Sequence, residues 1–113
     1  MWLPERFFDP ATALSGSSPA YMYMFIDALA NAGTEVGLPR SDALTLAAHA
    51  AYGAAAMVLE TGESPEALKN AVCSPGGSTL AGVDALEKGG FRDTVKAAIE
   101  AACARNKELG EIR

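Results

Sequence analysis

Apolar residues recur at spacings of three and four along most of the chain, which is the period of an amphipathic α-helix. The pattern predicts one helix over residues 19–32, with Ser18 as its N-cap and Gly33 just after its end. A longer helix is predicted to begin near Pro39 and to end before Gly62. Both predicted helices are followed by glycine, the residue that most often follows a helix C-terminus.

Three further helices are predicted in the second half of the chain, over residues 65–72, 78–88 and 91–110. Ser64 is the expected cap of the first of these, and paired glycines end the second. Residues 1–17 contain two prolines and a glycine without a helical period, so we expect them to form an extended lead-in. Because no segment alternates with period two, the predicted fold class is all-α, in a single domain of 113 residues.

The predicted helix over residues 39–61 is apolar on nearly every face. A helix of that kind belongs at the centre of a bundle or of an oligomer. Gly53 weakens its middle by up to about 1 kcal/mol relative to alanine, a cost that is tolerable if another backbone must come close there. Alanine dominates the apolar composition and each alanine buries little area, so a second chain is the expected source of further burial.

Composition and charge exclude several kinds of partner. The formal net charge is −5 and no run of basic residues occurs, which argues against nucleic acid and anionic membranes. The N-terminus lacks the features of a signal peptide, and no stretch reaches the ~20 uninterrupted apolar residues of a membrane span. Cys73 and Cys103 form no CxxC pattern, so we expect free thiols in a reducing cytoplasm.

The segment "SPGGST", residues 74–79, interrupts this helical chain and is named the SPGGST loop below. The first N–H groups of a helix lack intrahelical partners and lie at the positive end of the helix dipole. Glycines let a ligand approach those groups, and serine and threonine hydroxyls add donors, so the loop suits a carboxylate or phosphate. The alternative is an ordinary turn in which Ser78 or Thr79 only caps the following helix.

Residues 14–18, "LSGSS", form a second glycine-and-hydroxyl segment, named the LSGSS segment below. Capping is again the alternative to ligand binding there, although two such segments in one small domain favour convergence on one site. His49 is the only histidine and has no partner at helical spacing, so a structural role is expected for it. We predict no metal site and assign no catalytic acid or base. The sequence also contains no GxGxxG or Walker A pattern.

In these two segments and around them, the sequence resembles the C-terminal dimerisation domain of pyrroline-5-carboxylate reductases. The matching stretches are "LSGSSPAY", "LANAGTEVGLPR", "GAAAMVLETGESPEALKNAVCSPGGSTLAGVDALEKGGFR" and "ARNKELG", in the family's order. The resemblance covers residues 9–109. It implies a helical domain that interleaves with a second copy in a homodimer or larger oligomer. It also implies reduction of the cyclic imino acid 1-pyrroline-5-carboxylate to L-proline with NADPH or NADH.

The resemblance also implies which residues bind ligand. The substrate carboxylate is expected at the SPGGST loop, with Val72 packing nearby and N–H or hydroxyl donors from the loop residues Ser74, Gly76, Gly77, Ser78 and Thr79. Thr12 and Ser17 are expected near the nicotinamide and the substrate ring.

The chain departs from the family pattern at a few positions. Ser18 stands where glycine is commoner, Ala56 replaces a frequent lysine, Ala71 stands where an acidic or amide residue is usual, and Ser78 replaces a frequent threonine. The family's Rossmann-type dinucleotide domain lies outside these 113 residues, so we expect the chain alone to be inactive. The alternative function is a freestanding, non-catalytic dimerising module.

Overall fold

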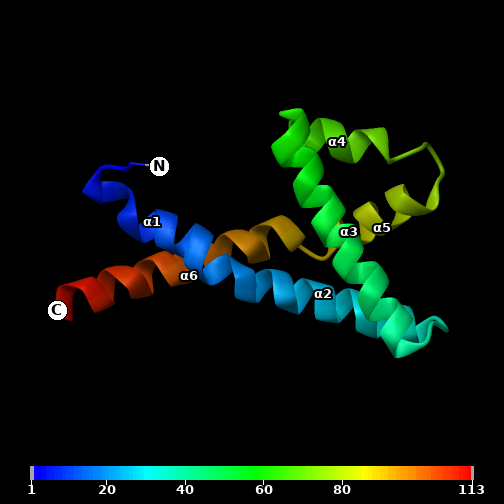
Figure 1. Ribbon diagram of the computed structural model, residues 1–113, viewed down its shortest axis with the longest axis horizontal. Coiled ribbons are helices and arrows are strands. Elements are labelled where there is room, and N and C mark those ends of the chain that lie inside the picture. The colour runs from blue at the N-terminus through cyan, green and yellow to red at the C-terminus, as the bar shows by residue number, and fades with distance from the viewer. Residues whose placement is uncertain (1, 113) are drawn as a thin grey trace. The chain divides into compact units, whose positions relative to one another are not determined.

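The computed structural model describes residues 2–112, and all regular structure in that range is helical (Figure 1). In chain order the elements are the 3₁₀ turn η1 (Glu5–Phe7), α1 (Phe8–Thr12), the π-helical turn η2 (Ala13–Ser17), α2 (Ser18–Glu35), α3 (Arg40–Thr61), α4 (Pro65–Ala71), α5 (Ser78–Lys88) and α6 (Phe91–Ile112). The predicted all-α class is therefore confirmed for the described residues.

The chain divides into two compact units. One unit combines the chain up to Met22 with the chain from Leu86 onward, and the other is Tyr23–Ala85. The first contains α1, η2 and α6, and the second contains most of α2 together with α3, α4 and most of α5.

The first unit corrects the prediction of an extended lead-in, because helical turns begin at Glu5 and continue into α2. Pro10 is tolerated because it occupies the third position of α1, where a backbone N–H has no intrahelical acceptor. Pro19 is the second residue of α2, which follows η2, the only π-helical turn in the described chain. Gly16 also lies within this turn and does not end the helix.

Ser18 is not the N-cap that the sequence predicted. Its backbone is helical, with φ −59° and ψ −30°, and it continues the chain from η2 into α2. Its hydroxyl donates a hydrogen bond to the Ala13 carbonyl at 3.3 Å, and among the described residues no N–H group of the following turn donates to it. The prediction was wrong because the Ser-Pro pair typical of a helix start follows a π turn here.

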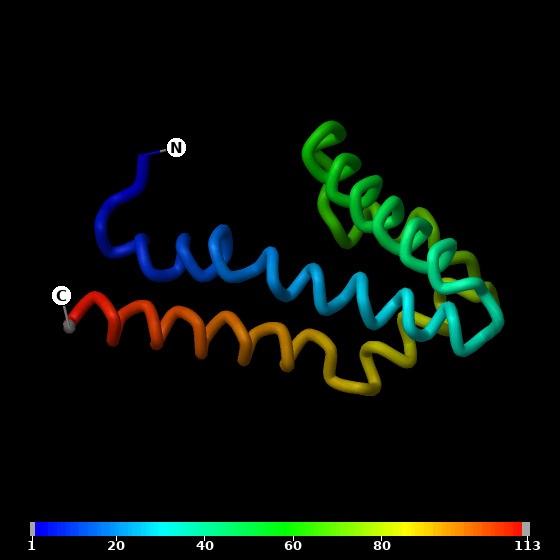
Figure 2. Tube along the Cα trace, turned by 60° about the horizontal axis from the view of Figure 1, so that its bottom comes forward, coloured from blue at the N-terminus to red at the C-terminus, as the bar shows by residue number. Residues whose placement is uncertain are grey.

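α1 and η2 pack against α6, which brings the two ends of the chain together (Figure 2). Ala13 is fully buried in this unit. The Asn106 side chain on α6 donates a 3.4 Å hydrogen bond to the Asp9 carbonyl, across 97 residues of sequence. A small side chain at the centre and a polar contact near the end therefore fix this pairing.

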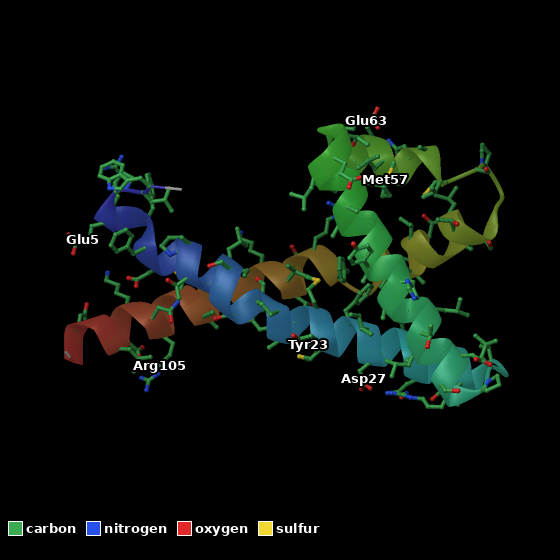
Figure 3. All side chains as sticks on the ribbon, viewed as in Figure 1. Glu5, Tyr23, Asp27, Met57, Glu63 and Arg105 are labelled. Carbon is green, nitrogen blue, oxygen red and sulfur yellow. The ribbon has the colours of Figure 1, made fainter. Side chains whose placement is uncertain are left out.

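In the second unit, α2 extends to Glu35, so the predicted end before Gly33 was wrong. Gly33 instead lets α3 approach: a Cβ placed there would lie 3.2 Å from the Cβ of Ala43. The connection turns at Gly37, whose φ of 118° favours glycine. Asp27 on α2, labelled in Figure 3, pairs with Arg40 on α3 at 2.9 Å. Arg40 also donates to Asn31.

The remaining helix bounds agree with the sequence patterns to within one or two residues. α3 ends at Thr61, and the next residue, Gly62, adopts the left-handed conformation with φ 70°. Ser64 caps α4 as predicted, accepting a 3.1 Å hydrogen bond from the Ala67 N–H. A second left-handed glycine, Gly90 with φ 80°, separates α5 from α6.

The buried core is small. Its buried hydrophobic residues are Ala13, Ala30, Ala43 and Ala47, and no large side chain is fully buried among the described residues. Large apolar side chains are exposed instead, including Tyr23 of α2 at 70% and Met57 of α3 at 48% (Figure 3). Proteins that act as monomers seldom expose so many apolar side chains.

α3 carries much of this exposed apolar surface. Leu46 is 59% exposed and Leu59 is 84% exposed, and apart from the neighbouring residues and backbone of α3 itself, no described atom lies within 4 Å of a Cβ built at Gly53. The close approach that would make Gly53 tolerable is not found within the described chain, whereas Gly33 does make a close approach. Among the described residues, α3 also has the length and apolar composition of a membrane span, against the sequence expectation, because its alanines count as apolar. The core helix of an assembly has the same composition.

Candidate functional site

The SPGGST loop connects the end of α4 at Ala71 to the start of α5 at Ser78. α4 closes with a hydrogen bond from the Val72 N–H to the Lys69 carbonyl at 3.1 Å. The Cys73 N–H then bonds to the Asn70 carbonyl at 3.2 Å. The loop thus leaves α4 with its last carbonyls partly satisfied and enters a separate turn.

That turn is formed by Ser74, Pro75, Gly76 and Gly77, with the Gly77 N–H donating to the Ser74 carbonyl at 2.9 Å. Pro75 occupies the second position and Gly76, with φ 73°, the third, which is the sequence and geometry of a type II turn. Only glycine adopts that third-position φ without strain. Pro-Gly is therefore the pair of residues that this turn requires.

Gly77 is needed for a different reason. A Cβ built there would lie 3.1 Å from the Ser74 carbonyl oxygen and 3.5 Å from the Ser74 Cβ. Any side chain at residue 77 would press on the turn that it closes. The two adjacent glycines thus shape the backbone that leads into α5, one through its conformation and the other through the space beside it.

The N-terminus of α5 is accessible and its donors are available. The first intrahelical bond runs from the Ala81 N–H to the Gly77 carbonyl, so the N–H groups of Ser78, Thr79 and Leu80 precede the helical ladder. Within residues 2–112, the hydroxyls of Ser78 and Thr79 make no hydrogen bond, so neither acts as a side-chain cap. The geometry leaves N–H and O–H donors free at the positive end of a helix.

Exposure divides the predicted site residues into two groups. Gly77 is half-buried, and the others in and beside the loop are exposed: Val72, Ser74, Gly76, Ser78 and Thr79. A small anion can therefore reach the loop backbone from solvent. A carboxylate needs such convergent, unpaired donors, and the loop provides them.

The two predicted residues of the N-terminal region lie in the first unit. Thr12 is exposed at the end of α1, and Ser17 is half-buried at the end of η2. In the neighbouring LSGSS segment, the Ser15 hydroxyl donates to the Ala11 carbonyl at 2.8 Å. Because the SPGGST loop belongs to the second unit, the predicted convergence of the two segments stays a prediction.

An open groove in the first unit was not predicted from the sequence. It measures about 770 Å³ and is lined by residues of α1, η2 and α6, among them Phe8, Thr12, Asn106, Lys107 and Leu109. The groove combines residues about 100 positions apart, and no local pattern signals that pairing. The apolar stripe of the last helix was the only available sign that it packs on another element.

Other candidate chemistry is sparse. His49 lies exposed on α3 beside Tyr52 in a shallow hollow. The described residues contain no group of three or more His, Cys, Asp or Glu that could hold a metal ion. Cys73 and Cys103 are both free and half-buried. The SPGGST loop is therefore the feature with the most available polar groups.

Comparison with protein families matches residues 5–109 to the family described as pyrroline-5-carboxylate reductase dimerisation. The pyrroline-5-carboxylate reductase of Pisum sativum is 53% identical over 105 residues, covering 93% of this chain and 38% of that protein. Pyrroline-5-carboxylate reductase 2 of Homo sapiens is 50% identical, covering 93% of this chain and 33% of that protein. The chain thus spans well under half the length of these relatives.

Solved structures agree with the sequence matches. The crystal structure of Plasmodium falciparum pyrroline carboxylate reductase with NADP bound superposes with a TM-score of 0.91 at 41% identity, covering 96% of this chain and 43% of that one. The 1-pyrroline-5-carboxylate reductase of Streptococcus pyogenes gives a TM-score of 0.92 at 41% identity, over 96% and 42%. These TM-scores show that this chain has the same fold as the matching parts of the two reductases.

Proposed function

Since the chain belongs to the pyrroline-5-carboxylate reductase dimerisation family, we propose that it is the dimerising, substrate-binding part of such a reductase. The reaction is the reduction of the C=N bond of 1-pyrroline-5-carboxylate to give L-proline, with NADPH or NADH. The two free thiols are compatible with a reducing compartment, and we assign the reaction to the cytoplasm.

The observation that carries the proposal is the set of free donors at the start of α5. The N–H groups of Ser78, Thr79 and Leu80 lie next to the exposed type II turn at Gly76. In the proposed site, these groups and the two hydroxyls bind the substrate carboxylate, and Val72 packs against the ring. Fixing the carboxylate orients the ring and its C=N bond, which lowers the entropic barrier to reaction.

The residues of this chain do not fit a dinucleotide. The described residues contain no β-strand, and the sequence contains no GxGxxG segment between a strand and a helix. A bound NADPH or NADH supplies the hydride, and we assign its binding to a Rossmann-type domain outside residues 1–113. Reduction of the imine by this chain alone is accordingly not expected.

A homodimer is the proposed partner arrangement, and the exposed apolar side chains support it. α3, a largely apolar helix of 22 residues, exposes Leu46, Leu59 and Met57. Light scattering at micromolar concentration should give a mass of two chains or more. Leu46→Asp, which puts a charge on this surface, should shift the mass toward one chain, whereas Glu63→Gln, at an exposed loop residue, should not. A stable wild-type monomer would refute the homodimer.

The carboxylate site is tested by titrating the isotope-labelled chain with L-proline and recording amide chemical shifts. The amides of Gly77, Ser78 and Thr79 should shift and saturate, with weak affinity because the cofactor side of the pocket is supplied elsewhere. L-Prolinamide, which keeps the ring and lacks the carboxylate, should shift them far less. Equal responses to the two compounds would exclude carboxylate recognition by the loop.

A further inference from the structure

His49 lies in the middle of the exposed apolar surface of α3. Leu46, three residues before it, is 59% exposed, and Tyr52, three residues after it, is 77% exposed. Residues three apart are neighbours on a helix surface, so these two side chains flank the imidazole. His49 itself is exposed and lines a shallow hollow of about 300 Å³ with Ala48 and Tyr52. A partner that covers Leu46 and Tyr52 must therefore cover His49 as well.

Gly53 leaves space on the same side of the helix. It follows His49 by four residues, and apart from the neighbouring residues and backbone of α3 itself, no described atom lies within 4 Å of a Cβ built there. Because this position has no side chain, a second copy can come close to the helix beside the imidazole. Such a contact removes the water that solvates a charged imidazole, which disfavours the charged form.

No charged group of α3 lies next to His49. The nearest ones along the helix are Asp42, seven residues before it, and Glu60, eleven residues after it. At 1.5 Å per residue, these two residues are about 10 Å and about 16 Å away along the helix axis. Residues 43–59 contain no Asp, Glu, Lys or Arg, so His49 is the one residue of this stretch whose side chain can become positively charged.

The elements that pack against α3 do not supply a partner for the imidazole either. α2 carries Asp27, which is already paired with the arginine at the start of α3, and Glu35, its last residue. α4 carries Glu66 and Lys69, which pair with each other at 2.8 Å. Within residues 2–112, His49 makes no hydrogen bond or ion pair with any of these groups.

We infer that His49 makes the α3 surface sensitive to pH, because protonation of its imidazole weakens the association of two copies through this surface. The inference rests on the proposed homodimer. In a homodimer of two-fold symmetry both copies present the same surface, and residues 43–59 offer no carboxylate to a protonated imidazole. An imidazole in water gains its proton at about pH 6.5. Association is therefore strong above that pH and weakens as the pH falls below it.

The first measurement is the dimer dissociation constant of the 113-residue chain, obtained by light scattering over a dilution series at about pH 7.5 and about pH 5.5. The constant should be roughly ten- to hundredfold larger at the lower pH, since each of the two imidazoles must lose its proton to be covered. His49→Gln, whose side chain stays neutral, should dimerise with little pH dependence. Glu60→Gln is the matched control, because it removes a titratable group from the same helix and should keep the wild-type pH dependence.

Two outcomes of this measurement would overturn the role of His49 and leave the homodimer standing. One is a wild-type dissociation constant that is the same at both pH values. The other is an equal pH dependence in the wild-type chain and in His49→Gln. A wild-type chain that is monomeric at every concentration and at both pH values would defeat the proposed homodimer and this inference together.

The second measurement follows the imidazole itself by NMR, and its signals are unambiguous because His49 is the only histidine. The pH at the midpoint of its titration should be lower at a protein concentration where the chain is dimeric than at a dilution where it is monomeric. A change of fold alone would not link this midpoint to protein concentration. A midpoint that stays the same on association, or that rises because the second copy supplies a carboxylate, would contradict the inference.

Discussion

The LSGSS segment and the SPGGST loop are similar in sequence and different in structure. Each combines glycine and hydroxyl residues at the approach to a helix, with a proline inside the SPGGST loop and directly after the LSGSS segment. In the LSGSS segment the chain stays helical throughout, and two serine hydroxyls donate to backbone carbonyls. In the SPGGST loop the helix is broken by a type II turn, and the hydroxyls of Ser78 and Thr79 are free within the described residues.

The difference depends on where proline stands relative to glycine. At the LSGSS segment, Pro19 comes after the glycine and takes a helical position in α2, after the wider π turn. In the SPGGST loop, proline precedes glycine, which is the order that a type II turn requires. One order keeps donors occupied inside a helix, and the other leaves them available at its start. Hydroxyl content alone therefore does not identify a binding segment.

The largest effect is expected for Gly76→Ala. A non-glycine residue with a left-handed φ is destabilised by about 1–2 kcal/mol, so the turn should relax and the donors of α5 should move. We expect a loss of L-proline affinity of roughly five- to thirtyfold, measured by the amide titration. Gly62→Ala is the matched control, because its φ of 70° imposes similar strain at the end of α3. Equal loss of affinity in both variants would contradict a local role for the turn.

A smaller effect is expected when the free hydroxyls are removed. A hydrogen bond typically contributes about 0.5–1.5 kcal/mol net, so Ser78→Ala and Thr79→Val should each weaken L-proline binding roughly two- to tenfold. Ser15→Ala, which removes a hydroxyl of the LSGSS segment, should leave the titration at residues 77–79 unchanged. A larger loss in Ser15→Ala than in the other two variants would reverse the contrast between the segments.

The smallest effect is expected for Gly16→Ala. A Cβ at this position would lie 3.6 Å from the Thr12 Cγ2, an ordinary contact, and alanine favours a helical backbone over glycine. Stability in denaturant unfolding should rise by up to about 1 kcal/mol, with ligand response unchanged. A fall in stability would mean that the π turn needs glycine, as the SPGGST loop does.

The helices from α3 onward could be predicted because their boundaries use local chemistry. Ser64 caps α4, and Gly62 adopts the left-handed conformation that closes α3. The prediction for the N-terminal region was wrong because its proline and glycine residues do not break the helices there. Pro10 falls in a first turn, where it displaces no hydrogen bond, and Gly33 serves helix packing against Ala43 and not a helix end.

The site was predictable only in part. The turn chemistry of Pro75 and Gly76 is local, so residue order pointed to a break with exposed amides. The sequence could not predict which hydroxyls donate hydrogen bonds to backbone carbonyls, because that depends on which carbonyls the helical backbone places within reach. The pairing of Asn106 with Asp9 depends on contacts across the whole chain, which helical periodicity does not encode.

The exposure of α3 links folding to the amount of protein present. A helix whose leucines and methionine are covered only in the proposed homodimer gains much of its stability from association. Folding then obeys mass action: dilution favours unfolded chains, and the melting temperature rises with protein concentration. A substitution on this surface can therefore reduce the yield of folded protein in a dilute cell extract while leaving a concentrated sample unaffected.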